Sequence, residues 1–140
     1  MKNYIYLIVF FVFVGCNNEN PTDDGTFGGK FKIDQLNGTL YYSDIPEWLA
    51  VKILEIEAEN ANDIPIIKIS IHKCEWKGRS AYFIHEPWKS SLNDPFYENG
   101  KVVTFSSIDE MSDFFNTSEN WLLIYEFGKG EQHFEGLHFN

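Results

Sequence analysis

Two β-rich segments joined by the dipeptide Lys77-Gly78 constrain this chain more than any other feature of its sequence. The segments span residues 66–76 and 79–86, and both are rich in β-branched and aromatic residues. A two-residue loop that ends in glycine suits the twist of an antiparallel hairpin. The sequence therefore predicts a β-hairpin in which Trp76 pairs with Arg79 and Cys74 pairs with Ala81.

This register sorts the hairpin side chains into two faces, because successive residues of a strand point to opposite sides of the sheet. One face, which we expect to lie against the core, carries Ile69, Ile71, Tyr82 and Ile84. The other face carries Ser70, His72, Cys74, Ala81, Phe83 and His85. A helix is therefore expected to cover the first of these faces.

Two other segments, one before and one after the hairpin, have the apolar spacing of amphipathic helices, and each begins with a capping-box pattern. The first pattern is Asp44-Ile45-Pro46-Glu47, and the apolar stripe of this segment consists of Ile45, Trp48, Leu49, Ile53 and Ile56. The second pattern is Ser107-Ile108-Asp109-Glu110, and its stripe consists of Ile108, Met111, Phe114 and Phe115. We predict one helix after each pattern, with its stripe buried.

The remaining strand signals complete the predicted fold. Residues 96–103 carry Asn99-Gly100 as a tight turn, and residues 121–127 form a nearly continuous apolar strand. Residues 31–42 are consistent with either a short hairpin or an extended lead-in. The order of elements predicts an α+β fold, a small antiparallel β-sheet with two helices packed mainly on one face.

Composition narrows the functional classes. The chain has 140 residues and a formal net charge of -10, which argues against a nucleic-acid partner because phosphate binding needs a basic surface. Its two cysteines are too few for a disulfide scaffold or a four-cysteine zinc site. No cofactor is expected, and the length favours a single globular domain.

The first sixteen residues have the pattern of an export signal. Lys2 precedes an apolar run from Ile5 to Val14, which is too short for a membrane-spanning helix of roughly twenty residues. The ending Phe13-Val14-Gly15-Cys16 resembles the lipobox of bacterial lipoproteins, with Phe13 where that family prefers leucine. The resemblance implies cleavage after Gly15 and attachment of fatty acyl chains such as palmitate to Cys16, which would anchor the protein to a membrane.

This resemblance predicts four regions along the chain. Residues 1–15 are expected to be the signal peptide, residues 16–30 a flexible tether, residues 31–127 the domain and residues 128–140 a C-terminal tail. Position 17 is Asn rather than the Asp of the best-known inner-membrane retention signal. We therefore expect a cell-envelope protein in the outer membrane, and its periplasmic or surface-exposed face is left open.

A second resemblance covers about 35 residues. The hairpin segment from Glu75 to Phe83, followed by the segment from Asp94 to Gly100, is similar to uncharacterised small lipoproteins of Gram-negative anaerobes. Those proteins repeat an aromatic-x-Gly hairpin and then an acidic-Asn-Gly turn. The resemblance implies no known activity.

Three residues on the second hairpin face are candidate metal ligands. His72 and His85 are diagonal neighbours in the predicted register, and Cys74 lies two residues from His72. Diagonal side chains start about 7 to 8 Å apart, so two imidazoles and a thiolate could converge on one zinc or copper ion. The alternative is a half-buried polar face in which Cys74 is a small core residue.

Exposed aromatic residues are the other candidate site. Trp76 lies next to the hairpin turn, and Trp88 and Tyr97 lie in or beside the following loop. Such rings offer a large contact area at little entropic cost. The sequence predicts a non-enzymatic binding or inhibitory module for a protein ligand, and the alternative is a glycan-binding accessory lipoprotein that uses these three rings. A small metal-binding domain is the third hypothesis.

Overall fold

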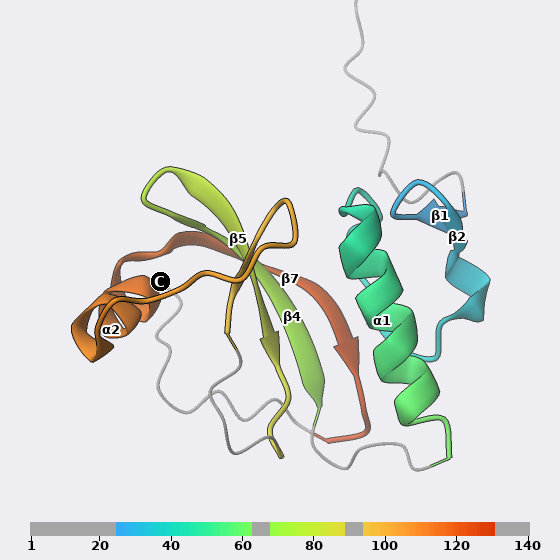
Figure 1. Ribbon diagram of the computed structural model, residues 1–140. Helices are drawn as coiled ribbons and strands as arrows, with labels where there is room; N and C mark the ends of the chain where they lie inside the picture. The colour runs from blue at the N-terminus through green and yellow to red at the C-terminus, as the bar shows by residue number, and fades with distance from the viewer. Residues whose placement is uncertain (1–24, 63–67, 89–93, 131–140) are drawn as a thin grey trace, which may run out of the picture.

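The computed structural model describes residues 25–62, 68–88 and 94–130 and has the predicted α+β fold (Figure 1). Its main sheet has five antiparallel strands in the order β3-β7-β4-β5-β6. These strands are β3 (Thr39–Leu40), β4 (Ile69–Trp76), β5 (Arg79–His85), β6 (Phe96–Tyr97) and β7 (Glu119–Phe127). A second, two-stranded sheet consists of β1 (Thr26–Phe27) and β2 (Phe31–Lys32). The helical elements are the short 3-10 helix η1 (Ile33–Gln35) and the α-helices α1 (Glu47–Glu59) and α2 (Ile108–Thr117).

The predicted hairpin is confirmed with its register. Strands β4 and β5 pair Trp76 with Arg79 and Cys74 with Ala81. Lys77 and Gly78 form the turn, and both have positive φ angles, of 49° and 71°. These angles match the two-residue turns that follow the twist of a hairpin. Strand β4 also pairs with β7 on its other side, so it lies in the middle of the sheet.

Helix α1 covers the predicted core face. Leu49, Ile53 and Ile56 from the helix are buried against this face. The sheet contributes Ile69, Ile71, Tyr82, Ile84, Tyr125 and Phe127 to the same cluster. The predicted cap is wrong, because the helix begins at Glu47 with Pro46 at the N-cap and no capping side chain. Asp44 lies too far before that start to cap it.

Helix α2 packs on the opposite face of the sheet, so the two helices do not share one face as expected (Figure 1). Phe114 of α2 is buried with Cys74, Trp76 and Ala81, whose side chains alternate along the strands with those of the α1 face. The physical reason is that this second face is itself apolar and needs a cover. The sheet therefore has a hydrophobic cluster on each side.

The start of α2 agrees with the predicted capping pattern, although its apolar stripe does not. The hydroxyl oxygen of Ser107 accepts a hydrogen bond from the backbone N–H of Glu110 at 3.2 Å. Ile108, expected in the buried stripe, is 79% exposed, whereas Phe114 is fully buried. The first turn of α2 thus projects beyond the sheet, and only its later residues reach the core.

The domain begins earlier than predicted. Strands β1 and β2 pair across residues 26–32, and Phe27 is fully buried in the cluster beneath α1. Gly28 has a φ of +57° and packs so closely on Ala50 that a side chain there would collide with it. Residues 25–30 therefore belong to the folded domain and not to a tether. The predicted tail beyond residue 130 and the signal peptide lie outside the described residues.

The segment between β2 and α1 is an extended lead-in, and it is fastened to α1 by Glu57. The Glu57 carboxylate accepts hydrogen bonds from the backbone N–H groups of Asn37 and Gly38, from the Asn37 side-chain amide and from the Tyr125 hydroxyl, at 2.7 to 2.9 Å. This resolves the alternative left open for residues 31–42: η1 and the short strand β3 lead into the sheet, and the Asn37-Gly38 turn is held by a buried carboxylate.

Candidate functional site

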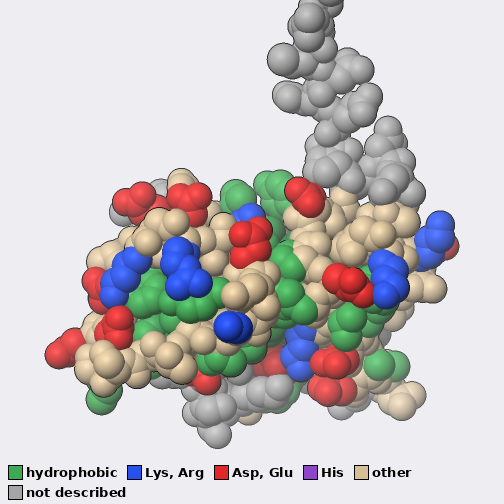
Figure 2. Space-filling model, turned by 45° about the horizontal axis from the view of Figure 1, so that its top comes forward, with side chains coloured by type: hydrophobic (Ala, Val, Ile, Leu, Met, Phe, Trp, Pro, Cys, Tyr) green, Lys and Arg blue, Asp and Glu red, His purple; other side chains and the backbone are tan. Residues whose placement is uncertain are grey.

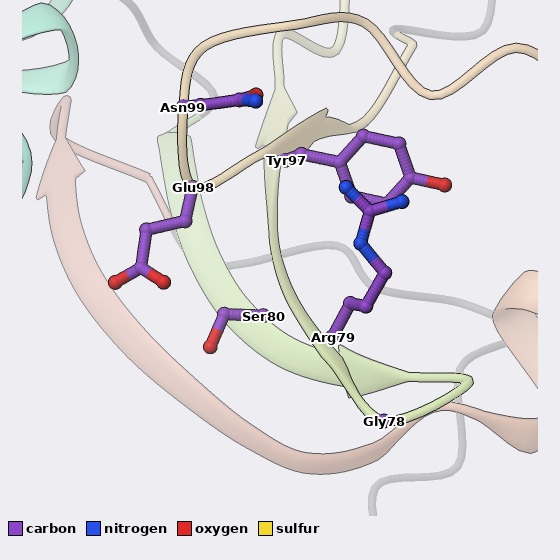
Figure 3. Close-up of a pocket in the computed structure, with 6 residues that line it drawn as sticks. All are labelled: Gly78, Arg79, Ser80, Tyr97, Glu98 and Asn99. Atoms are coloured by element: carbon purple, nitrogen blue, oxygen red, sulfur yellow. The ribbon is translucent and has the colours of Figure 1, made fainter.

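A pocket of about 360 Å³ lies between the tip of the β4–β5 hairpin and the turn that follows β6 (Figure 3). Its volume falls in the range of small-ligand sites. The lining is polar and consists of Gly78, Arg79, Ser80, Tyr97, Glu98 and Asn99. Two segments separated in sequence by the loop after β5 therefore form one site.

The pairing of β5 with β6 places these residues together. Ala81 pairs with Tyr97, so Arg79 is the diagonal neighbour of Tyr97 on the same face of the sheet. The turn after β6 is closed by a hydrogen bond from Gly100 N–H to the Tyr97 carbonyl at 2.8 Å. The indole N–H of Trp48 in α1 donates to the Glu98 carbonyl at 2.8 Å, which fixes this turn against the helix.

The centre of the pocket is the pair of Arg79 and Tyr97. The guanidinium carbon of Arg79 lies 3.6 Å from the centroid of the Tyr97 ring, which is a close cation–π contact. Arg79 is the single arginine of the sequence. Within residues 25–62, 68–88 and 94–130 no hydrogen bond or ion pair engages its guanidinium. The group is positioned by the ring, and its N–H donors remain open.

The other lining residues give the pocket two chemically different ends. The Asn99 side-chain oxygen accepts a hydrogen bond from Lys101 N–H at 3.1 Å, which leaves the Asn99 amide N–H groups without a partner in the described part of the chain. Figure 3 shows the Glu98 carboxylate and the Ser80 hydroxyl on the side of the pocket away from the Arg79 guanidinium. One end therefore offers donors, and the other offers a carboxylate and a hydroxyl group.

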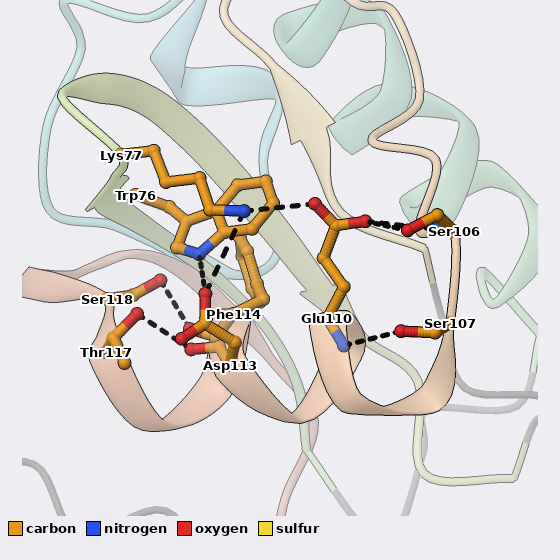
Figure 4. A network of polar contacts seen from close by, with 9 residues as sticks. All are labelled: Trp76, Lys77, Ser106, Ser107, Glu110, Asp113, Phe114, Thr117 and Ser118. Carbon is orange, nitrogen blue, oxygen red and sulfur yellow. Dashed lines mark hydrogen bonds and ion pairs between the residues drawn. The ribbon is translucent and has the colours of Figure 1, made fainter.

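Trp76, predicted as an exposed ring, is buried. It is 4% exposed and packs against Phe114 and Phe105 in the cluster beneath α2. Its indole N–H donates to Asp113 at 3.3 Å, and the Lys77 ammonium lies 4.1 Å from the centre of its ring (Figure 4). The prediction is wrong because α2 covers this face of the hairpin.

The predicted aromatic platform of Trp76, Trp88 and Tyr97 is not formed. Trp88 is 49% exposed, but it does not line the pocket with Tyr97. One face of the Tyr97 ring is covered by the Arg79 guanidinium. Of the three predicted residues, Tyr97 alone contributes to the pocket, and it does so as a support for Arg79.

The structure does not bring His72, Cys74 and His85 into a metal site. Among the described residues no group of three or more His, Cys, Asp or Glu side chains is close enough to hold a metal ion. His72 is buried and shares a hydrogen bond of 3.1 Å with the Ser70 hydroxyl, whereas His85 stacks on the Phe83 ring. The side chains are directed to neighbours along the sheet and not to one point.

Burial also shifts the pKa values of Cys74 and His72 toward their uncharged forms. It raises the pKa of the Cys74 thiol to about 11 and, with the nearby His85 charge as a second cause, lowers the pKa of His72 to about 4. At neutral pH the thiol is protonated, and a thiol nucleophile requires the thiolate. The structure therefore agrees with the alternative reading of this face, in which Cys74 is a small core residue.

Sequence reasoning missed Arg79 as a site residue. The available signal was a lone arginine at a hairpin tip in an acidic chain. Its aromatic support could not be identified, because the loop between β5 and β6 leaves their register open. On the face drawn in Figure 2, acidic and basic side chains are interspersed, so the net negative charge does not remove local cationic surface.

Comparisons of the chain with protein-family models, with curated proteins and with solved structures found no match.

Proposed function

We propose that this chain is an envelope lipoprotein, acylated at Cys16 and anchored in the outer membrane, whose domain is a non-enzymatic binding module for a protein ligand. The observation that carries the binding role is the Arg79 guanidinium, held on Tyr97 at the pocket with its donors open. A positioned polar group in a concave site is the usual basis of specific recognition.

The contents of the pocket favour recognition over catalysis. Among the described residues that line it, Glu98 is the one carboxylate, whereas glycoside hydrolysis generally uses a pair of carboxylates. The same described lining residues include no cysteine or histidine. The Cys74 thiol is buried in the cluster under α2, where substrate has no access.

A protein ligand fits this pocket better than a glycan that stacks on aromatic rings. Stacking of a sugar needs an open ring face, but Arg79 covers one face of Tyr97 and Trp76 is buried. The glycan hypothesis thus loses the Trp76 ring and one face of the Tyr97 ring. It remains the competing outcome of the binding experiments below.

The binding role is tested by filling the pocket. We expect Ser80→Trp to obstruct the pocket whatever the chemistry of the ligand, whereas Lys52→Trp places the same side chain at a partly exposed position of α1 outside the pocket lining, as a control. Immobilised full-length proteins would be incubated with envelope extracts, and bound proteins would be quantified by mass spectrometry. A partner enriched by wild type and Lys52→Trp but lost with Ser80→Trp supports the proposal. If no protein shows this dependence in repeated trials, the proposal is wrong.

The anchor is supported by the apolar run and the order Val14-Gly15-Cys16. In the described part of the chain, no helix has both the length and the apolar character needed to cross a bilayer. We expect Cys16→Ser to abolish partitioning into the detergent phase, because acylation requires the thiol, and Cys74→Ser to leave partitioning unchanged. Detergent phase separation after expression in a bacterial host measures both. Membrane retention of an uncleaved Cys16→Ser protein after a high-salt wash would contradict the lipoprotein assignment.

A further inference from the structure

We infer that the pocket between the hairpin tip and the β6 turn binds a carboxylate of the protein ligand, through Arg79 held on Tyr97. The inference rests on the proposed binding function and names the chemistry of the contact. The carboxylate comes from an acidic side chain or from a free chain terminus of the ligand, and the experiment below separates these sources.

The orientation of Arg79 is the first argument. A guanidinium is a planar fork of N–H donors that matches the two oxygens of a carboxylate. Contact with the Tyr97 ring at 3.6 Å covers one face of the group and leaves the donors at its edge available. Because the ring already restricts the side chain, less conformational freedom is lost when a carboxylate binds.

Lys77, two residues away on the same hairpin tip, is a cation with a structural role and can be compared with Arg79. Its ammonium also lies over an aromatic ring, at 4.1 Å from the centre of Trp76. It contacts the carboxylates of Glu110 at 3.0 Å and Asp113 at 3.9 Å, which fasten the turn to α2 (Figure 4). Arg79 has the same kind of aromatic support but no carboxylate partner in the described chain. The unfilled position is therefore one that an external carboxylate can occupy.

The rest of the lining fits a carboxylate that belongs to a peptide. Within the same lining, the Asn99 amide N–H groups supply further donors. Glu98 lies at the other end of the pocket, away from the guanidinium, and can accept hydrogen bonds from backbone N–H groups of the ligand (Figure 3). A peptide carries both complements, a carboxylate and N–H donors, within a few bonds.

The inference can be tested directly with small probes, because Arg79 is the one arginine and gives a unique Nε–H signal in nuclear magnetic resonance spectra. The full-length protein in detergent would be titrated with N-acetyl-glycyl-glycine, with its C-terminal amide and with N-acetyl-aspartate amide at constant ionic strength. Glucuronate and glucose would be titrated in the same way, as two sugars of which only the first carries a carboxylate. We expect the two peptide carboxylates to shift the Arg79 Nε–H and Asn99 amide signals with millimolar Kd values and the amide-capped probe to leave them unchanged.

The two carboxylate probes separate the sources. Tighter binding of N-acetyl-glycyl-glycine indicates a chain terminus, and tighter binding of N-acetyl-aspartate amide indicates an acidic side chain. Equal shifts with the carboxylate and amide probes, or no shift with either carboxylate, would overturn the inference. Stronger binding of glucuronate than of both peptide probes would contradict the peptide source and support a glycan ligand.

Variants give the second readout. Arg79→Gln should weaken carboxylate binding about tenfold or more, because it removes charge-assisted hydrogen bonds. Lys52→Gln removes the same charge from the surface of α1 and should bind like wild type. A partner captured equally by wild type and Arg79→Gln but lost with Ser80→Trp would leave the binding function intact and refute the carboxylate contact. Probe binding without any captured partner would support the carboxylate contact and refute the protein-binding function.

Discussion

Two charged side chains of this domain, Glu57 and Arg79, differ in how the protein uses them. Glu57 is buried beneath the Asn37-Gly38 turn and accepts hydrogen bonds from four donor groups of its own chain. Arg79 is exposed and positioned by one aromatic contact, and its donors remain open in the described chain. The first group joins two parts of the fold, whereas the second faces a pocket.

This difference separates stability from recognition. A buried carboxylate must be satisfied, since leaving its charge or its donors without partners is costly. An exposed guanidinium has no such desolvation cost, so the folded domain can leave its donors available to a ligand. We therefore expect changes at Glu57 to alter unfolding and changes at Arg79 to alter binding.

Glu57→Gln should have the largest effect on stability. The substitution keeps the shape but replaces an accepting oxygen by an NH2 group that meets backbone donors, so at least one buried donor loses its partner. We expect a loss of about 3 kcal/mol in the free energy of unfolding. Urea unfolding followed by tryptophan fluorescence measures it, with the exposed Glu55→Gln as control. A loss no larger than that of the control would mean that Glu57 does not hold the turn.

Gly38→Ala should have the next largest effect. A Cβ at this position would collide with the Tyr125 hydroxyl, the group that also donates to Glu57, and with the Glu126 carbonyl. Overpacking of this kind typically costs 1 to 3 kcal/mol, and we expect about 2 kcal/mol here. The same unfolding measurement applies. A loss within about 0.5 kcal/mol, the range of a surface substitution without a collision, would contradict this expectation.

Acidification should weaken the Glu57 contact specifically. Burial acts to raise the pKa of Glu57, but hydrogen bonds from Asn37, Gly38 and Tyr125 outweigh it and hold the pKa below the ordinary value of 4.5. Because the unfolded chain takes up this proton first, the stabilisation is present above pH 4.5 and is lost as the pH falls through the lowered pKa. As the pH is lowered through this range, the free energy of unfolding should fall more steeply for wild type than for Glu57→Gln. Parallel curves would contradict the assignment.

Arg79→Gln should have the smallest effect on stability. The side chain is exposed and has one aromatic contact, so we expect a change within about 0.5 kcal/mol. The measurement is again urea unfolding, and Tyr97→Leu serves as a comparison because that ring is partly buried in the cluster under α2. A loss of the size expected for Glu57→Gln would show that Arg79, like Glu57, is a structural residue.

Local patterns predicted the β4–β5 hairpin, its register and both helices. The register followed from the two-residue turn, which fixes the pairing of every later residue. The pairing of β5 with β6 could not be predicted in the same way, because a long loop connects these strands. Arg79 and Tyr97 are therefore neighbours through a contact that the sequence does not specify locally. The burial of Trp76 was missed for a related reason, since it depends on where α2 packs.

The alternation of side chains along β4 and β5, the Lys77-Gly78 turn and the Ser107 cap follow from local sequence, because each depends on residues close together in the chain. Contacts between distant segments set which helix covers which face and which charged groups acquire partners. Glu57 became a structural residue because the Asn37-Gly38 turn folds onto it. Arg79 stayed open because β6 brings it the Tyr97 ring, while the Glu98 carboxylate of the following turn lies on the other side of the pocket (Figure 3). Both outcomes depend on distant segments meeting in space, which local sequence patterns do not encode.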